Sequence, residues 1–498
     1  MKSFLMFKDR DFLYEKEISS NMKNLIEDLE LETIFKSVSK EDENIEDVLK
    51  ISFLSLLNDI EEIGYRQDIL KDAIEYAQMI EKLYSITIDA IEEEKRVFFS
   101  FFRKYPDVIL HSSIKRVEIS IKYINFIKEI VCDDSYNFKS EGFLNLKRRL
   151  EKEFSHEYIL QLKEHLKELH FRHGIVIRYS VDEGMKGANP IVYKIEQKNR
   201  KWFKDLLHKR SKYSKFCIDS KDECGERMLN DIKNQGICSI ANTLSKSANH
   251  LRSFLHTFNK ELAFYIGATR LYRMLKDMGV DMVFPKPAMC EKKIKSFEKL
   301  SDITLLIAKG KNVVTNDLNT LGKDIFLITG ANRGGKTSFI RALCVAQIMM
   351  QIGMFVTAKS FHSSIKNQIF THFKKEEDSS LKSGKFDEEM KRLSGIIDEI
   401  SPCSMIVFNE SFSSTNEAEA SLIAMDIIEA LSSKEVEVVF VTHMYTLAEK
   451  LLKSRDKNSV FLRAQRLENG KRSYKIVENR PLPTSYGEDL YNAIFKKA

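Results

Sequence analysis

The chain has 498 residues, a net charge of +6 at pH 7, 31% charged residues and 10% aromatic residues. This composition excludes a disordered chain, and the length predicts more than one domain with a large core. The apolar start is interrupted at Lys8 and is too short for a signal peptide, and no apolar run is long enough to cross a membrane. We therefore expect a globular cytoplasmic protein without a membrane partner.

Few residues in the chain break helices, since only 7 prolines and 19 glycines occur, and this predicts long helices. The seven cysteines are scattered, odd in number and without the spacing of metal ligands. We interpret them as reduced thiols, as expected for a cytoplasmic protein.

The first part of the chain is predicted to be helical with one interruption. Residues 1–140 are helical in character, and Phe143–Phe171 indicates one long amphipathic helix rich in Lys, Glu and Leu. This helix is either a coiled-coil arm or a surface helix with charge pairs four residues apart. Gly174–Ser180 and Pro190–Ile195 then have the composition of two strands and predict a hairpin between helical arms.

A strongly basic stretch overlaps the second of these strands. Residues 186–215 contain ten Lys and Arg against two acids, a local net charge of +8, with Tyr193, Trp202, Phe203 and Tyr213 among them. Cations that neutralise phosphates, with aromatics nearby, favour contact with a nucleic-acid backbone. The alternative is a solvated helix face with a few core aromatics, since the stretch has no base-reading motif.

The helical pattern ends before an α/β region. Met228–Met274 predicts a further helix with a continuous apolar face, and Pro285 and Pro287 then break the pattern, so we expect a domain boundary near residue 290. From Ser301 onward, strands and helices alternate, which is typical of a largely parallel sheet.

Asp324–Arg341 has the pattern of a phosphate-binding loop. Phe326–Ile328 predicts a buried strand, and the residues that follow it fit G-x-x-x-x-G-K-[ST] before an amphipathic helix. Glycines let backbone N–H groups turn onto phosphate oxygens, and the helix N-terminus adds positive potential. Lys336 is placed to reach the β- and γ-phosphates, and Thr337 to ligate Mg²⁺. The predicted nucleotide-binding residues are Gly330, Ala331, Asn332, Arg333, Gly334, Gly335, Lys336, Thr337 and Ser338.

Two further strands end in residues that suit ATP hydrolysis. Ser404–Phe408 is followed by Asn409 and Glu410, and a carboxylate there can orient or deprotonate the attacking water. We predict Glu410 in that role, and Asn409 and Glu410 as metal ligands beside Thr337, although Asn409 lacks the charge of the expected Asp. Val436–Val441 leads to His443, which is predicted to contact the γ-phosphate or the water. The predicted catalytic residues are Lys336, Glu410 and His443.

The C-terminal part of the chain resembles the ATPase domain of MutS-type DNA mismatch repair proteins. The resemblance rests on five segments in order, ITGANRGGKTSFIRA (328–342), QIGMFVTA (351–358), FNESFSSTNEAEA (408–420), FVTHMYTLAE (440–449) and TSYGEDL (484–490). The helical first half is similar, more weakly, to the core and lever domains of that family. The β element at 174–195 falls where the family has the clamp that touches DNA.

The resemblance implies an α + α/β fold with two domains. Residues 1–290 are expected to form a helical core/lever domain with the clamp-like insertion at 174–195, and residues 291–498 a P-loop ATPase domain of MutS/ABC type. ATP and Mg²⁺ are the implied cofactors. A homodimer with ATPase sites completed across its interface is also implied, with Ser383 the candidate residue for reaching the partner's nucleotide.

Departures from the family pattern limit what the resemblance implies about mismatches. Helices similar to the core domain begin near residue 1, so we expect no mismatch-reading or connector domain before them, and no nuclease-like domain after residue 498. No Phe-x-Glu reading element can be assigned. Val313 and Val314 occupy the positions before Asn316 where an aromatic would stack on adenine.

These sequence features are compatible with three functions. The first is an ATP-driven dimeric clamp that acts in repair or recombination on double-stranded DNA that is mismatched, branched or otherwise structured. Such a clamp would bind the DNA through its helical arms and the basic stretch 186–215. The second is a nucleotide-switched ATPase that binds a protein partner through its arms, which the neutral Asn409 favours. The third, a transport ATPase of ABC type, is disfavoured by the long helical half and the absence of transport signals.

Overall fold

The computed structural model describes residues 2–12, 18–98, 105–171, 174–181, 187–193, 218–219, 221–310, 312–375, 384–454, 457–466 and 472–482. The chain divides into two compact units. Unit 1 consists of Met1–Ser3, Glu81–Phe138 and Phe143–Asn259, and unit 2 of Phe4–Ile80, Lys139–Gly142 and Lys260–Ala498. The predicted domain boundary near residue 290 stays a prediction.

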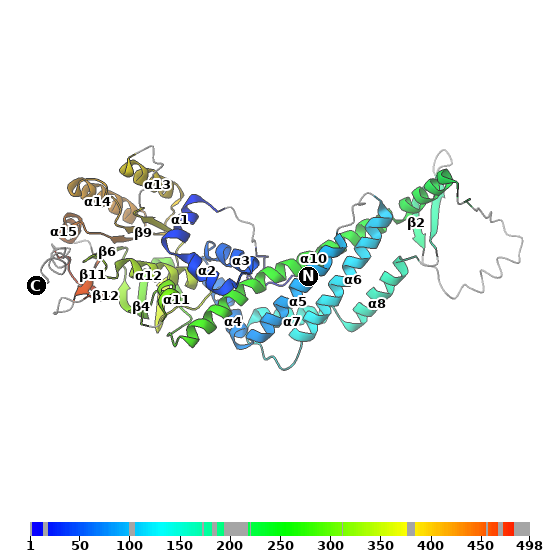
Figure 1. The fold of residues 1–498 in the computed structure, drawn as a ribbon, viewed down its shortest axis with the longest axis horizontal. Helices are drawn as coiled ribbons and strands as arrows, with labels where there is room; N and C mark the ends of the chain where they lie inside the picture. The colour runs from blue at the N-terminus through cyan, green and yellow to red at the C-terminus, as the bar shows by residue number, and fades with distance from the viewer. Residues whose placement is uncertain are drawn as a thin grey trace, which may run out of the picture. The chain divides into compact units, whose positions relative to one another are not determined.

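Unit 1 is built from long helices. They are α6 (Pro106–Val131), α8 (His156–Leu169) and the parts of α5 (Ala77–Phe98), α7 (Glu141–Glu153) and α10 (Glu223–Asp277) that fall within the unit. α6 starts at Pro106, whose fixed φ suits the first helical turn, and buries a face that includes Ile114 and Ile121. It lies beside α8 (Figure 1). It also pairs with α5 through the buried Arg116 and Glu94, 2.9 Å apart.

The predicted helix over Phe143–Phe171 is wrong in one respect, because the structure divides it into α7 and α8. The break lies at Phe154 and Ser155, and the Ser155 hydroxyl accepts a hydrogen bond from the Tyr158 N–H at 3.1 Å. A serine there satisfies a free N–H at a helix start, so it favours a new helix over continuation of the old one. The helix predicted over Met228–Met274 is confirmed as part of α10, which has 55 residues.

The predicted hairpin is confirmed. β1 (Val176–Val181) pairs antiparallel with β2 (Gly187–Tyr193), and Val176 lies opposite Tyr193. The hairpin contacts α10, where the Tyr179 hydroxyl donates to the Ile232 carbonyl at 2.9 Å. The predicted end of the second strand, and the basic stretch beyond Tyr193, lie outside the described residues.

Unit 2 begins with four helices, α1 (Ser20–Asp28), α2 (Leu31–Ser39), α3 (Glu43–Phe53) and α4 (Ile60–Glu75). Asp42 and Asp59 start α3 and α4, because their carboxylates accept hydrogen bonds from N–H groups of the first turn at 3.0 and 2.8 Å. α1 packs on strand β8 (Ile369–Phe373), and α2 packs on the short helix α11 (Ile303–Lys309).

A six-stranded sheet forms the centre of unit 2, in the order β12, β11, β6, β10, β9, β8. The adjacent strands from β11 to β8 are parallel, and β12 is antiparallel to β11. The strands are β6 (Ile325–Thr329), β8 (Ile369–Phe373), β9 (Met405–Asn409), β10 (Glu437–Val441), β11 (Ser459–Arg466) and β12 (Arg472–Glu478). The prediction of a largely parallel α/β sheet is confirmed.

Helices supply the apolar surfaces against which this sheet packs. They are α12 (Lys336–Gln351), α13 (Lys385–Glu399), α14 (Glu417–Ser433) and α15 (Tyr445–Lys453) (Figure 1). Leu327, Phe408 and Phe440 pack in one buried cluster with Ile428 of α14 and Leu447 of α15. All five residues of β6 and of β10 are buried, as expected for strands covered on both faces.

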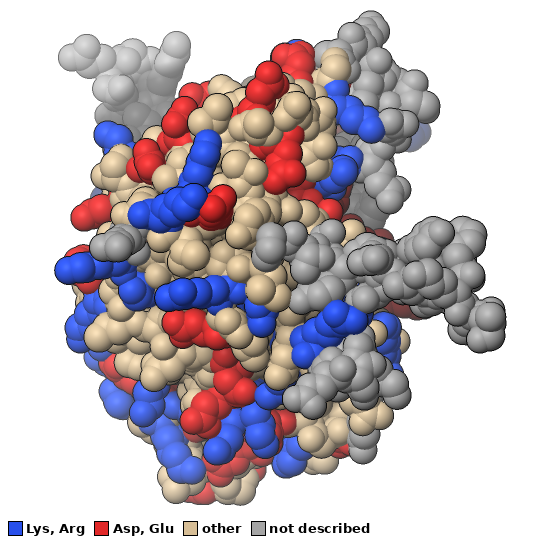
Figure 2. Space-filling view, turned by 90° about the vertical axis from the view of Figure 1, so that its left-hand side faces the viewer, with Lys and Arg blue, Asp and Glu red and all other residues tan. Residues whose placement is uncertain are grey.

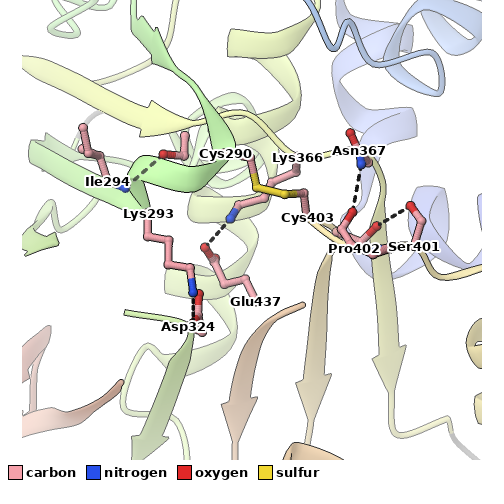
Figure 3. Close-up of a disulfide and its surroundings, with 12 residues drawn as sticks. Cys290, Lys293, Ile294, Asp324, Lys366, Asn367, Ser401, Pro402, Cys403 and Glu437 are labelled. Carbon is pink, nitrogen blue, oxygen red and sulfur yellow. Dashed lines mark hydrogen bonds and ion pairs between the residues drawn. A yellow bond between two sulfur atoms is a disulfide. The ribbon is translucent and has the colours of Figure 1, made fainter. Parts of the chain in front are cut away.

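A second sheet of four strands has the order β3 (Lys286–Ala288), β7 (Ser360–Ser364), β4 (Ile294–Leu300) and β5 (Asn316–Leu321). Ion pairs tie it to the six-stranded sheet (Figure 3). Glu437 of β10 pairs with Lys366 at 2.8 Å and with Lys295 of β4, and all three side chains are buried. Lys293 pairs with Asp324, just before β6, at 2.6 Å.

A disulfide joins Cys290, in the short helix η2 (Cys290–Lys292), to Cys403, and their Cα atoms are 6.1 Å apart (Figure 3). The interpretation of all cysteines as reduced thiols is therefore wrong for this pair. The two residues are separated by 113 positions in sequence, and only the approach of the two sheets brings them together. Among the described residues, the free cysteines are Cys132, Cys224, Cys238 and Cys344.

The predicted fold class is confirmed, because a long helical region precedes a mixed α/β domain. Within the described residues, no helix is both long and apolar enough to span a bilayer. The cytoplasmic location stays a prediction.

Candidate nucleotide-binding site

Three adjacent parallel strands bring the predicted site residues to one edge of the six-stranded sheet. β10 lies between β6 and β9, with Val441 opposite Ile328 on one side and Asn409 on the other. Because parallel strands end at the same edge, the loop after β6, Glu410 after β9 and His443 after β10 meet there. The sequence motif and the two strand ends thus form one site.

The loop between β6 and α12 has the backbone of a phosphate-binding loop. Gly330 and Gly335 have φ values of +119° and +94°, which residues with side chains rarely adopt. Ala331 lies within the loop, where its carbonyl accepts from the Gly334 N–H at 3.1 Å. Among the remaining predicted residues, Ser338 is half-buried, and those with exposed side chains are Asn332, Arg333 and Thr337.

Strands β11 and β12 lie directly behind these glycines, a constraint that sequence reasoning missed. A Cβ on Gly335 would lie 2.7 Å from the carbonyl oxygen of Tyr474 in β12. A Cβ on Gly334 would lie 2.9 Å from the Cβ of Ala464 in β11. The loop is therefore pressed against the β11–β12 pair, which no local sequence signal could have indicated.

Lys336 is folded back onto its own loop. Its Nζ donates to the carbonyl oxygens of Gly330 and Ala331 at 2.9 and 3.1 Å, and the side chain is largely buried. Burial lowers the pKa of Lys336 to about 8, Glu410 opposes this shift, and Arg472 of β12 adds to it. Arg472 is therefore a cation near the loop that sequence reasoning did not identify.

His443 lies between Lys336 and Glu410. Its Nε2 is 2.9 Å from the Glu410 Oε1 and 3.2 Å from the Lys336 Nζ. The Nε2 of His443 donates to Glu410 when it carries a proton and accepts from Lys336 when it does not, so it can hydrogen-bond only one of the two at a time. The hydrogen bond from His443 is the main reason that the pKa of Glu410 is lowered, although partial burial opposes it. The three predicted catalytic residues are thus brought together.

The predicted metal ligands suit a magnesium ion shared with phosphate. The Asn409 Oδ1 and the Thr329 Oγ1 are buried at this edge and have no hydrogen-bond partner among the described residues. These oxygens, the Thr337 hydroxyl and the Glu410 carboxylate are hard donors of the kind Mg²⁺ prefers. The described residues contain no cluster of three His, Cys, Asp or Glu that could hold a metal. Mg²⁺ here would therefore need phosphate and water oxygens to complete its shell.

Some predicted site residues lie outside the part of the chain that the structure describes. They are Ser383, the segment 484–490, and the cationic residues of the basic stretch 186–215. Their placement stays a prediction.

A parallel sheet with a glycine-rich loop, its lysine, and a carboxylate and a histidine at neighbouring strand ends is characteristic of P-loop ATPases. Comparison with known proteins gives the family. Residues 58–278 match the MutS2 N-terminal domain, and residues 326–495 match MutS domain V.

Similar proteins carry MutS names. The DNA mismatch repair protein MutS of Leptospira interrogans is 34% identical over 144 residues, which are 28% of this chain and 17% of that protein. The MutS protein homolog 4 of Mus musculus is 33% identical over 141 residues, 28% of this chain and 15% of that protein. The DNA mismatch repair protein MutS of Prochlorococcus marinus (strain AS9601) is 26% identical over 230 residues, 44% of this chain and 24% of that protein.

The chain belongs to the MutS family, with a MutS2-type N-terminal domain and a MutS domain V, which is an ATPase domain of the ABC type. It spans less than a quarter of the length of each of these three relatives.

Proposed function

We propose that this protein binds ATP with Mg²⁺ and hydrolyses the bond between its β- and γ-phosphates. We propose further that ATP binding closes a dimeric clamp on DNA and that hydrolysis opens it again. The observation that carries the proposal is the contact of His443 with both Lys336 and Glu410 at the ends of three parallel strands. The substrate class follows from the loop, because backbone N–H groups, a helix N-terminus and a lysine together bind polyphosphate.

Each residue has a separate part in the proposed reaction. Lys336 exchanges the carbonyls of Gly330 and Ala331 for phosphate oxygens and stabilises the charge that develops on them. Once Lys336 has moved, the His443 Nε2 is free to hold Glu410 or to contact the γ-phosphate. Glu410 orients the attacking water, and its lowered pKa suits orientation better than full proton removal. Thr337, Asn409 and Glu410 would hold Mg²⁺ through their oxygens, and the bound ion would neutralise charge on the phosphates.

The ATPase part is tested by two substitutions with a matched control. We expect Lys336→Ala to lose nucleotide affinity and Glu410→Gln to keep it, while both lower the rate of phosphate release by about a hundredfold or more. Lys391→Ala, which removes an exposed lysine paired with Asp387 in α13, should hydrolyse ATP at the wild-type rate. Wild-type turnover in both site variants, or no binding of ATP with excess Mg²⁺, would refute this part.

The DNA part rests on the first half of the chain and on the family. In sequence, the hairpin β1–β2 falls at the position for which the resemblance implies the clamp, and the basic stretch of net charge +8 overlaps its second strand. Figure 2 shows positive and negative side chains interspersed on the face that lies at the left of Figure 1. The described residues of that face therefore form no patch of a single charge that would attract DNA. We therefore assign DNA contact to the helical arms and residues 186–215.

The dimer part rests on the family, with Ser383 as the proposed residue that reaches the partner's nucleotide. Light scattering of the wild type and of Glu410→Gln, with and without ATP, would measure whether nucleotide closes a homodimer. A constant monomer mass in every condition would refute the dimeric clamp. A panel of homoduplex, mismatched and branched DNAs would then identify the preferred DNA structure.

A second function is favoured by one observation, the neutral amide of Asn409 where a carboxylate is expected. Slower hydrolysis would suit a nucleotide-switched ATPase that binds a protein partner. DNA-stimulated turnover in the wild-type protein would favour the clamp. A rate of ATP hydrolysis that no DNA in the panel changes would favour the protein-binding switch.

A further inference from the structure

The turn that carries Glu410 has an unfavourable backbone. Glu410 and Phe412 have φ values of +55° and +65°, in the left-handed region that residues with side chains rarely adopt. Two such residues on either side of Ser411 need neighbouring groups to hold them. The Glu410 N–H donates to the Val441 carbonyl at 3.0 Å, which fixes one end of the turn.

His372 holds the middle of the turn. It lies in β8, is almost completely buried, and its Nδ1 is 2.8 Å from the Ser411 hydroxyl oxygen. Its ring also stacks against the Phe412 ring, with centroids 5.8 Å apart and planes at 28°. His372 therefore contacts the two residues that follow Glu410.

The other ring nitrogen of His372 connects the turn to helix α13. The Nε2 lies 3.1 Å from the backbone carbonyl of Glu389. Burial, with Arg392 as a second cause, lowers the pKa of His372 to about 4, so the ring is neutral near pH 7 and carries one proton. With that proton on Nε2, the ring donates to the Glu389 carbonyl. The Ser411 hydroxyl has one proton and lies 2.6 Å from the His372 backbone carbonyl and 2.8 Å from Nδ1, so it shares that proton between the two acceptors. The neutral ring and the backbone carbonyl of His372 therefore hold Ser411 together.

The side chain of Glu389 supports the same turn. Burial raises the pKa of its carboxyl, while Arg392, the Phe412 backbone and the Ser414 side chain lower it. α13 also donates to the sheet through Arg392, whose guanidinium contacts the Phe373 carbonyl at 3.1 Å. The turn after Glu410 is thus held between β8 and α13 by polar groups.

We propose that His372, anchored on the Glu389 carbonyl, is a positioning residue that sets the direction of the Glu410 carboxylate through Ser411. The proposal rests on the proposed ATP hydrolysis and adds a determinant of its rate. It also gives α13 an influence on catalysis, because a shift of the helix moves the anchor of the His372 ring.

The test separates hydrogen bonding from packing. His372→Phe keeps a ring against Phe412 and the backbone carbonyl that accepts from Ser411, and it removes both hydrogen bonds of the imidazole ring. We expect kcat for ATP to fall about tenfold while KM changes less than about twofold. His372→Asn keeps an amide at the Nδ1 position for Ser411, and it should recover part of the lost kcat. Ser411→Ala removes the contacts with both the ring and the backbone carbonyl of His372, so it should lower kcat at least as much as His372→Phe. Adding His372→Phe to Ser411→Ala should change kcat little further.

Phe361→Leu is the matched control, because it disturbs the buried ring pair with Phe297 in the four-stranded sheet without touching the turn. Its kcat should equal that of the wild type. Wild-type kcat in both His372→Phe and Ser411→Ala would overturn the inference, and Ser411→Ala alone decides if His372→Phe does not fold. Absence of turnover in the wild-type protein would instead refute the proposed function.

Discussion

Individual residues of the phosphate-binding loop depend on what lies behind them. Gly335 combines a φ of +94° with the Tyr474 carbonyl oxygen at 2.7 Å from any added Cβ. The glycines are therefore needed for packing against β11 and β12 as well as for approach to phosphate. Their substitution should affect the loop even in the absence of nucleotide.

Gly335→Ala should lower stability by about 1–3 kcal/mol and abolish nucleotide binding, because a backbone carbonyl cannot move aside as a side chain can. Gly64→Ala is the matched control, since a Cβ there meets nothing within 4 Å and the residue lies in α4. It should be neutral or stabilise by up to about 1 kcal/mol. Denaturant unfolding and nucleotide titration of both variants measure this, and equal behaviour would contradict the explanation.

His372 predicts a pH dependence of stability. Its pKa is lowered from 6.5 to about 4 by burial, so below pH 6.5 the unfolded chain takes up a proton that the folded protein resists. The protein should therefore lose up to about 3 kcal/mol through this residue as pH falls from 6.5 to 4. Unfolding midpoints of the wild type and His372→Phe across this range provide the measurement. The variant should lose less stability on acidification, and parallel curves would contradict the prediction.

Among the secondary-structure elements, the two sheets of unit 2 are joined by charge as well as by apolar packing. Burial alone would raise the pKa of Glu437, but Lys295 and Lys366 together lower it. Burial lowers the pKa of Lys295, which Glu437 opposes. One carboxylate thus compensates two buried ammonium groups, and the sheets cannot separate without losing that compensation.

Glu437→Gln should destabilise the protein by about 3–5 kcal/mol, because it leaves two buried lysines without a counter-charge. Glu435→Gln, two residues earlier and exposed, should change stability by less than about 0.5 kcal/mol. Thermal and denaturant unfolding compare the two. A similar small effect in both would mean that the ion cluster does not hold the sheets together.

For the molecule as a whole, the proposed DNA contact predicts a strong salt dependence. If residues 186–215 neutralise phosphates, the logarithm of affinity should fall with the logarithm of salt concentration by about 0.9 per phosphate contact. Replacing Lys201 and Lys204 by Glu should weaken binding and make that slope shallower, as fluorescence anisotropy with labelled duplexes would measure.

The control for this prediction reverses the same number of charges elsewhere. Lys391 and Lys453 are exposed on α13 and α15, and their replacement by Glu should leave both affinity and slope nearly unchanged. Equal losses in the two double variants would indicate a general charge effect. Binding that does not respond to salt would remove the nucleic-acid part of the proposed function.

Features that depend on local chemistry could be predicted from the order of residues alone. The spacing of Gly330 to Thr337 between an apolar strand and an amphipathic helix predicted the loop, and the structure has it there. Glu410 and His443 were predicted from the ends of two apolar runs, and the parallel register brings both to the loop that carries Lys336. Such predictions succeed because periodicity and turn residues act over a few positions.

The distant residues that support the site became apparent only in three dimensions. Nothing in the order of residues joins Tyr474 to Gly335, His372 to Ser411, or Cys290 to Cys403, because each pair meets through the packing of segments from different parts of the chain. The residues that we propose to be catalytic are marked by local motifs. The residues that hold them in place are selected by three-dimensional fit, which one sequence does not reveal.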